Sequence, residues 1–507
     1  MNSIINKVWK KLETYLFGRI ILKIIFFLIY IFLKKNKLKK WQLIKIKYFC
    51  LIGLEKINYA VKLLKELEVN DKYNKNKDIK LLYLSIANYC ITNNKLELAI
   101  KLFKNRVINS PKDLWAWRIL LDFNYYLCNF KEASRLHQKY INREIKYNLK
   151  DAINKKKINY FGIYYTHSIG HICILADHII SKKLNLTNFD KDILYIDKDL
   201  VANYSLLNYI KPFYEVKYKD DIEYNYDVIV ELENPFAYFF EYLNKWYHWY
   251  DIRPKIYSKW YQNKNAPLLT INDEDAKYGR IQLNKRGVKN SDWFVVMHVR
   301  SSSGGSNRNA DILTYTNAIE LIIKNGGWVI RIGDNKMPLM AKRSNFIDLS
   351  QDKIKDDRLD TYLLGSCLFS IVSTSGPANV PILFGKSSIQ TNLIPFRHSV
   401  PYNEDIILPV LYYSKIKKRL LTFREIINSN ISYSEISIRY NLDLILIKND
   451  ADDILNAVKE MLNNKLYKSS IKQSSMQIKF KNLCDELNVS INPQVSDSFL
   501  IKYSDLI

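Results

Sequence analysis

Apolar segments typical of strands alternate with segments of helical periodicity between residues 293 and 392. This alternation constrains the fold of the chain most strongly. Residues 293–299 form an apolar run rich in β-branched residues, which is typical of a strand buried on both faces. The further segments of this region are strands expected at 328–334, 346–350, 369–373 and 388–392 and helices expected at 313–324 and 360–367. This rhythm predicts parallel strands joined by right-handed crossovers.

A weaker version of the same rhythm precedes it. Residues 158–165 resemble a strand, and a turn and a helical segment follow it. The turn has the sequence THSIGH, residues 166–171, and is called the SIGH turn below. Residues 193–197 and 226–232 offer two more strands. We therefore predict an α/β fold with two Rossmann-like domains, and the predicted parts are 151–285, 286–460 and a helical tail at 461–507.

Residues 36–150 show helical spacing of apolar residues and almost no glycine. Two units of 34 residues align with the tetratricopeptide pattern, and its key positions are Ala87, Ala99, Phe103 and Pro111 in the first unit and Trp117, Leu120 and Ala133 in the second. Small residues at Ala99 and Ala133 permit close helix crossing. An all-α, tetratricopeptide-like region is predicted, which either binds a protein partner or acceptor or extends the packing of the next domain.

The apolar segment 16–33 is the one place where the sequence suggests contact with a bilayer. A spanning helix needs about 20 apolar residues, but this segment contains Arg19 and Lys23, and more lysines follow it. We favour an in-plane helix on an anionic membrane surface within residues 1–35. A single span and a helix that caps the next domain remain alternatives.

Composition excludes several classes of protein. The chain has 507 residues, 48% of them hydrophobic, so it can bury substantial cores. Its net charge of +26 is spread over the sequence, and no nucleic-acid-binding motif is present, so no nucleic acid partner is expected. The six cysteines form no CxxC pair, which fits a reducing cytoplasm.

Polar residues follow two of the predicted strands. The strand at 293–299 leads to His298 and Arg300, and the loop after it supplies Arg308, Asn309 and Asp311. The residues that follow the strand at 369–373 or end it are Ser373, Thr374, Ser375 and Gly376, and Asn392 ends a later strand. Guanidinium groups pair with phosphate oxygens, and small residues leave backbone N–H groups accessible. We expect a diphosphate site here, although Asp311 also suits a helix N-cap and Asn392 an ordinary turn.

Two motifs in the first α/β region are further candidates. His167, Gly170 and His171 lie in the turn after its first strand, where a histidine can act as a general base or merely satisfy the turn. Asp197 and Asp199 follow the second strand, and two carboxylates spaced in this way suit a divalent cation. The second pattern is short and common, so we do not expect a metal or another cofactor.

The motifs HVR, RNADI, STSG, FGK and TN, in this order, resemble a family of bacterial glycosyltransferases with two Rossmann-like domains, the GT-B architecture, and more distantly the H-x-R fucosyltransferases. The SIGH turn and the carboxyl-terminal VSDSFLIKYSDLI are also similar to that family. The resemblance implies that His298 and Arg300 lie at the donor site, with Arg300 on the diphosphate of a nucleotide sugar.

This resemblance implies transfer of a sugar to a lipid-linked or glycan acceptor of a cell-surface polysaccharide, at the cytoplasmic face of a membrane. His171 is then the candidate base and Arg300 the candidate catalytic cation. Two alternatives remain open. One is a metal-dependent transferase that uses Asp197 and Asp199, and the other is a catalytically inactive binding or scaffold protein built on the helical repeats.

Overall fold

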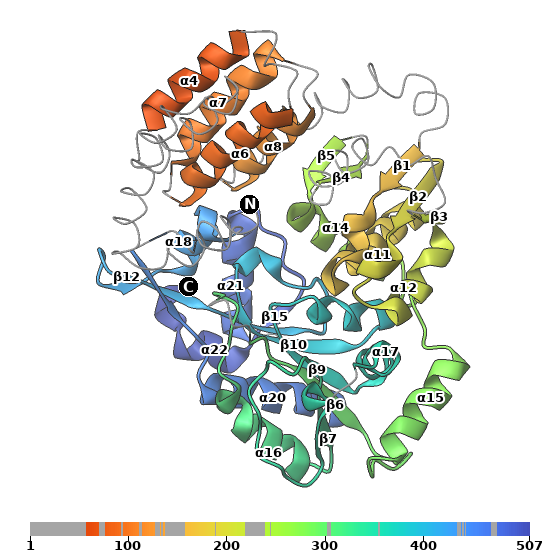
Figure 1. The fold of residues 1–507 in the computed structure, drawn as a ribbon. Coiled ribbons are helices and arrows are strands. Elements are labelled where there is room, and N and C mark those ends of the chain that lie inside the picture. Colours follow the sequence, from red (N-terminus) through yellow and green to blue (C-terminus); the bar gives the residue numbers. More distant parts are fainter. Residues whose placement is uncertain are drawn as a thin grey trace, which may run out of the picture. The chain divides into compact units, whose positions relative to one another are not determined.

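The structure is a computed structural model (Figure 1), and it describes residues 57–69, 77–92, 95–110, 114–126, 132, 135–136, 158–187, 189–218, 239–243, 245–301, 306–352, 355–432, 438, 441, 443–467 and 474–507. The chain divides into two compact units, residues 1–112 and 113–507. The apolar segment 16–33 lies outside the described residues. Within the described ranges, no helix is both long and apolar enough to cross a membrane.

The first unit contains helices α4 (Ile57–Val69), α6 (Lys77–Thr92) and α7 (Leu96–Asn109). Ala99 and Phe103 of α7 are fully buried, and the Phe103 ring meets the Tyr83 ring of α6 edge to face at 5.4 Å between centroids. Burial of a small residue one turn from an aromatic residue is the arrangement that the repeat pattern predicts. Pro111 and Ala133 lie outside the described residues, so the tetratricopeptide assignment stays a prediction.

A parallel sheet of seven strands forms the centre of the second unit (Figure 1), with the order β15-β11-β10-β9-β6-β7-β8. Its strands are β6 (Phe294–His298), β7 (Trp328–Arg331), β8 (Phe346–Asp348), β9 (Phe369–Ser373), β10 (Ser387–Leu393), β11 (Ile406–Pro409) and β15 (Gln494–Val495). The five strands predicted between 293 and 392 are confirmed. Because β6 pairs directly with β9, with His298 opposite Val372, the two polar segments predicted for the site lie side by side.

Helices cover both faces of this sheet. Side chains of β6 alternate between the faces, so Val295 and Met297 join one core and Phe294 and Val296 the other. The helices are α15 (Asp273–Asn284), α16 (Thr316–Lys324), α17 (Asp357–Ser366), α18 (Phe423–Ile427), α20 (Ala451–Leu466), α21 (Ser475–Glu486) and α22 (Asp497–Lys502). The tail at 461–507 is therefore not only helical, because it also supplies edge strand β15.

The first α/β region contains a smaller parallel sheet with the order β1-β2-β3. Its elements are β1 (Ile158–Phe161), α11 (Ile169–Lys183), β2 (Lys191–Ile196), α12 (Tyr204–Ile210), β3 (Glu215–Tyr218) and α14 (Trp249–Gln262). The strand predicted at 158–165 ends at Phe161, and a 3-10 turn follows over Ile163–Thr166. The strand predicted at 226–232 lies outside the described residues.

Three smaller features complete the described part of the second unit. Helix α8 spans Leu114–Tyr126. The strands of two small antiparallel sheets are β4 (Phe239–Tyr242) with β5 (Lys245–His248), and β12 (Leu411–Ser414) with β13 (Arg419–Leu420) and β14 (Leu444–Ile447). None of these elements contributes a residue to the candidate site described below.

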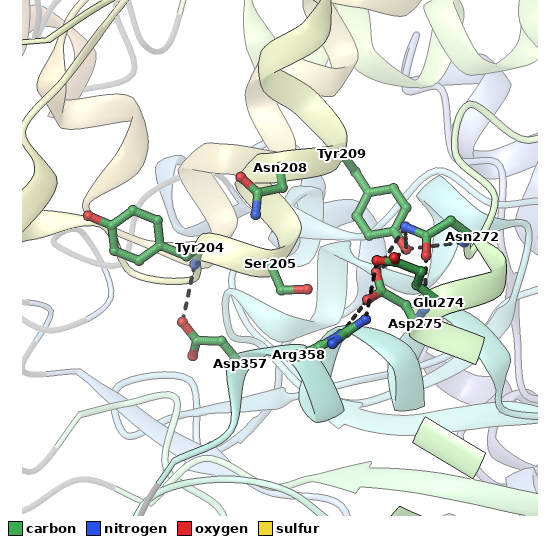
Figure 2. A pocket seen from close by; sticks show the side chains of 9 residues that line it. All are labelled: Tyr204, Ser205, Asn208, Tyr209, Asn272, Glu274, Asp275, Asp357 and Arg358. Atoms are coloured by element: carbon green, nitrogen blue, oxygen red, sulfur yellow. Dashed lines mark hydrogen bonds and ion pairs between the residues drawn. The ribbon is translucent and has the colours of Figure 1, made fainter. Parts of the chain in front are cut away.

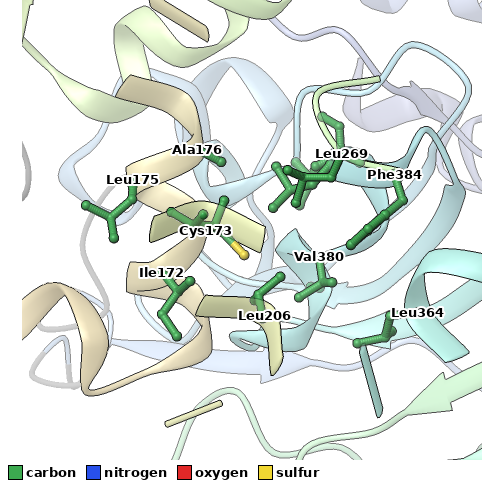
Figure 3. Close-up of a cluster of buried hydrophobic side chains, with 14 of the residues drawn as sticks. Ile172, Cys173, Leu175, Ala176, Leu206, Leu269, Leu364, Val380 and Phe384 are labelled. Atoms are coloured by element: carbon green, nitrogen blue, oxygen red, sulfur yellow. The ribbon is translucent and has the colours of Figure 1, made fainter. Parts of the chain in front are cut away.

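The two α/β regions share one hydrophobic core. Figure 3 shows Ile172 and Cys173 of α11 and Leu206 of α12 in the same cluster as Val380 and Phe384, which follow β9. Each of these five side chains is less than a tenth exposed. Burial of this size is worth about 25 cal/mol per Å2 of apolar surface, so the shared core holds the two regions together.

A buried ion pair lies within this core. The carboxylate of Asp177 in α11 lies 2.9 Å from Nε of Arg253 in α14, and both side chains are at most 2% exposed. Trp249 Nε1 and the Tyr257 hydroxyl also donate to Asp177, at 2.8 and 2.7 Å. A buried charge needs such partners, because an unpaired charge in the core is strongly destabilising.

Removing one member of this pair tests its contribution. We expect Asp177→Ala to lower the free energy of unfolding by roughly 3–5 kcal/mol, because it leaves the Arg253 guanidinium buried without its counter-ion. The exposed pair Arg424–Glu486 offers a matched control, and Glu486→Ala should change stability little. Urea denaturation at neutral pH measures both, and equal effects of the two substitutions would contradict the assigned role.

Candidate functional site

The candidate site lies at the carboxyl ends of β6 and β9. The backbone N–H of Arg300 donates to Ser373 Oγ at 2.8 Å, and His298 Nδ1 lies 3.1 Å from Ser375 Oγ. The Ser375 hydroxyl itself donates to the Ser373 carbonyl at 3.0 Å, so His298 Nδ1–H is the donor to that hydroxyl. The HVR and STSG motifs are thus joined by hydrogen bonds.

His298 is neutral near pH 7. Burial, and then the charge of Arg300, lowers the pKa of His298 to about 4. Its Nδ1–H donates to Ser375 Oγ, and its Nε2 is unprotonated near neutral pH. His298 therefore does not gain or lose a proton in this pH range. Of the two motif residues at the end of β6 and just after it, Arg300 therefore supplies the positive charge and His298 fixes the turn after β9.

The loop after Arg300 is only partly described. The Arg300 carbonyl accepts from the backbone N–H of Ala310 at 3.0 Å, and Asn309 N–H donates to the Ser306 carbonyl at 3.0 Å. Arg308 lies in the same turn, where its N–H donates to Ser306 Oγ at 3.2 Å. Residues 302–305 lie outside the described residues.

Asp311 begins the 3-10 turn Ile312–Tyr315 as its N-cap. Its carboxylate accepts from the backbone N–H of Leu313 at 2.9 Å. The helix-cap interpretation of Asp311 is thereby confirmed, and a contact of Asp311 with the donor stays a prediction.

The turn after β9 meets the SIGH turn backbone to backbone. A Cβ atom placed on Gly376 would lie 2.8 Å from the backbone nitrogen of Gly170, and one on Gly170 would lie 3.3 Å from the Gly376 Cα. A Cβ atom at Gly376 does not fit against this backbone, and one at Gly170 would require its neighbour to move slightly. The SIGH turn and the turn at 373–376, predicted separately, therefore lie in direct contact.

The buried ion pair also holds this turn. Arg253 Nη1 donates to Asn379 Oδ1 at 2.8 Å, and the Asn379 amide donates in turn to the carbonyls of Ser375 and Gly376 at 3.4 and 3.5 Å. Two short 3-10 turns, Pro377–Asn379 and Pro381–Phe384, follow Gly376. Pro381 lies at the start of the second turn, where a proline is tolerated.

Thr374 is held from the other side, because its Oγ1 accepts from the backbone N–H of Ile394 at 3.1 Å. Asn392, at the end of β10, is almost fully buried and has a positive φ of 49°. Its side chain donates to the Tyr315 hydroxyl at 3.2 Å and accepts from the Asn449 backbone N–H at 3.0 Å. These bonds join the end of β10 to Tyr315 and Asn449 behind the site, so the geometry favours a structural role of Asn392 in this turn.

His171 lies in the first turn of α11. Its Nδ1 faces the Tyr164 carbonyl at 3.3 Å, so Nδ1 carries the proton and Nε2 is the acceptor. Burial lowers the pKa of His171 to about 4. His167 is largely exposed. The partial burial of its ring still lowers its pKa, against the opposing effect of the Asp197 charge.

Asp197 and Asp199 follow β2, as predicted. Asp197 Oδ1 accepts from the backbone N–H of Asp199 at 3.2 Å and caps the short turn Lys198–Leu200. Within the described part of the chain, no group of three or more His, Cys, Asp or Glu residues is arranged to hold a metal ion. The structure therefore shows Asp197 as the cap of this turn.

Sequence reasoning missed three residues that hold the site, namely Asp177, Arg253 and Asn379. A signal for two of them exists, because Asp177 interrupts the apolar segment ICILADHII and Arg253 precedes a proline inside a helix. A charge in an otherwise apolar helix suggests a buried partner. Nothing in the sequence identifies that partner, since Asp177 and Arg253 lie far apart in the chain.

Comparison with known proteins gives little guidance. A scan against protein-family models finds no match, and a search of the curated proteins finds none either. A search of solved structures finds a similarity to a glycosyl transferase family 9 protein from Veillonella parvula DSM 2008, with 10% identity and a TM-score of 0.32 over 50% of this chain and 85% of that one. A TM-score this low carries no functional inference.

The glycine contact predicts an order of effects. We expect Gly376→Ala to lower the free energy of unfolding by about 1–3 kcal/mol, because its Cβ would overlap backbone that cannot rotate away. Gly170→Ala should lower it less, since its closest contact is 3.3 Å. Urea denaturation of both variants measures the order, and a reversed order would contradict the contact.

The depressed pKa of His298 predicts a pH dependence. Between pH 6.5 and pH 4 the unfolded chain binds a proton at His298 that the folded protein does not, so stability is lost as the pH falls through this window. His298→Gln should remove this share, on the order of 3 kcal/mol. Unfolding titrations of both proteins at pH 4.5 and pH 7 give the difference, and parallel pH profiles would exclude the shift.

Proposed function

We propose that the protein is a glycosyltransferase that uses a nucleotide-diphosphate sugar. The observation that carries this proposal is the joining of Arg300, Ser373 and Ser375 at one sheet edge, against the first turn of α11. Ligands of open α/β sheets bind outside the carboxyl ends of the strands, where these residues lie. The two Rossmann-like regions of a GT-B enzyme are consistent with the two parallel sheets.

Arg300 is the proposed partner of the diphosphate. Its guanidinium keeps its charge at every relevant pH and pairs with phosphate oxygens. The hydroxyl oxygen of Thr374 accepts a backbone N–H group, which leaves its proton directed elsewhere and able to donate to an anion, whereas the fully buried Ser373 hydroxyl holds the Arg300 backbone in place. Such preorganised donors stabilise the charge that develops on the leaving diphosphate.

In the proposed reaction the bond between the sugar C1 and the diphosphate oxygen breaks, and the acceptor hydroxyl oxygen bonds to C1. The hydroxyl proton leaves toward the solvent or a nearby base. His171 Nε2 is the proposed hydrogen-bond acceptor for that hydroxyl, and His167 and Gly170 complete the acceptor side. A pKa of about 4 makes His171 a weak base, so its role is mainly to orient the hydroxyl.

The finer parts of this proposal rest on the family resemblance. They are a lipid-linked or glycan acceptor for a cell-surface polysaccharide and a location at the cytoplasmic face of a membrane. A peripheral membrane contact would involve the segment 16–33, which lies outside the described residues. We propose that catalysis needs no metal, because Arg300 and the 373–376 turn supply the positive charge and the donors.

Transfer and donor-hydrolysis assays with UDP-, GDP- and CDP-sugars test the proposal. We expect Arg300→Ala to lower kcat/KM for the donor by roughly 100-fold, an effect typical of losing one charge-stabilising group. Arg300→Lys should restore part of it, since a lysine keeps the charge but loses the bidentate geometry. The control is Arg286→Ala, because Arg286 forms a surface ion pair with Asp352.

Three outcomes would contradict the proposal or redirect it. Full activity of Arg300→Ala would overturn the assigned role. Activity that is lost in EDTA and restored by Mg2+ or Mn2+ would favour the metal-dependent alternative at Asp197 and Asp199. If isothermal titration detects no binding of any nucleoside diphosphate to the wild type, the protein is a binding or scaffold protein instead.

A further inference from the structure

A polar hollow of about 480 Å3 lies between α12, the start of α15 and the start of α17 (Figure 2). The residues that line it are Tyr204, Ser205, Asn208, Tyr209, Asn272, Glu274, Asp275, Asp357 and Arg358. Every lining residue carries a hydroxyl, amide, carboxylate or guanidinium group. The hollow therefore offers many hydrogen-bonding groups, beside a comparable share of apolar surface.

The walls of the hollow are fixed by their own contacts. Asp275 accepts from the Tyr209 hydroxyl and from Arg358 Nε, both at 2.5 Å, and from the Asn272 amide at 3.1 Å. The Asp357 carboxylate accepts from the backbone N–H of Tyr204 at 3.1 Å, which ties α12 to α17. The space is thus preformed, and a ligand does not have to order the residues around it.

Two side chains of α12 face the hollow with unused polar groups. Ser205 and Asn208 lie three positions apart, so they occupy neighbouring places on one helix face. Within the described residues neither side chain makes a hydrogen bond or an ion pair, and Figure 2 shows Ser205 directed into the space between α12 and Arg358. The Tyr204 side chain, 44% exposed, adds an aromatic ring at the rim.

The hollow adjoins the SIGH turn. The backbone N–H of Ala202, two residues before Tyr204, donates to the Thr166 carbonyl at 2.8 Å. Thr166 directly precedes His167, and Gly170 in the same turn touches Gly376 of the phosphate-facing turn. A continuous path of contacts therefore leads from the proposed diphosphate site to the hollow.

The charges that line the hollow select a class of ligand. Its carboxylates, Glu274, Asp275 and Asp357, outnumber the single guanidinium of Arg358, so a phosphate or another anion is disfavoured. Asp275 and Arg358 already neutralise each other. The remaining hydroxyl and amide groups donate and accept, and the carboxylates accept, which suits a neutral ligand with many hydroxyl groups.

We propose that this hollow is the acceptor subsite and that it binds a neutral saccharide unit through Ser205 and Asn208. This inference rests on the proposed glycosyl transfer and adds the place and the chemical class of the acceptor. The saccharide presents one hydroxyl toward the SIGH turn while the donor diphosphate lies on Arg300.

Saturation-transfer NMR on the full chain tests binding without requiring catalysis. The probes are methyl hexopyranosides and methyl N-acetylhexosaminides, with inorganic phosphate as an anionic comparison. We expect at least one glycoside to bind the wild type, Asn208→Ala to weaken it about tenfold through the loss of hydrogen bonds, and Ser205→Phe to abolish it by filling the space. Asn284→Ala is the control, because Asn284 is exposed on α15 and does not line the hollow.

Kinetics separate this proposal from the proposed function. With the glycoside as acceptor, Asn208→Ala should raise the acceptor KM about tenfold, while nucleoside diphosphate binding and donor hydrolysis stay at wild-type levels. An unchanged acceptor KM, or no glycoside binding by the wild type, would overturn the subsite. Glycoside binding that Ser205→Phe abolishes, in a protein that binds no nucleoside diphosphate, would support the subsite and refute the transferase.

Discussion

The buried ion pair between Asp177 and Arg253 is the interaction on which the site depends. Asp177 belongs to the helix that begins with the SIGH turn, and Arg253 reaches through Asn379 to the turn that follows β9. One pair of charges thus fixes two loops from different sheets. The pair is buried, so its partners have to lie at hydrogen-bonding positions inside the protein. Asn379 is one of these partners, and its amide holds the backbone of the 375–376 turn.

Contact between Gly170 and Gly376 follows from this arrangement. With the two backbones this close, the two α/β regions leave no room for a ligand at that point. Under the proposed function, the donor sugar and the acceptor hydroxyl have to meet beside this contact. In that proposal Arg300 binds the diphosphate, and the polar hollow beyond the SIGH turn binds the acceptor.

The local signals in the sequence predicted the elements of the seven-stranded sheet well between 293 and 392. Buried parallel strands are continuous apolar runs, and β9 was located at its observed bounds. Strand β11 and the edge strand β15 were not predicted, and β15 has only two residues and gains its place by pairing with β11. Local patterns cannot indicate which strands pair, so the order β9-β6 had to come from the structure.

The sequence predicted which residue types belong to the candidate site, but it did not predict which of them contact one another. The small residues at 373–376 and Gly170 were recognised for their chemistry, yet their contact and the Asp177–Arg253–Asn379 chain depend on tertiary packing. Asn392 shows the converse, since its polar side chain and strand-end position suggested a ligand, and it instead bonds Tyr315 and Asn449. A polar residue at a strand end marks either a ligand contact or the support beneath one, and burial decides between them. By that criterion Asn392 and Asp177 hold the frame, whereas Arg300 and Ser205 are only partly buried and are the residues that the proposals assign to ligands.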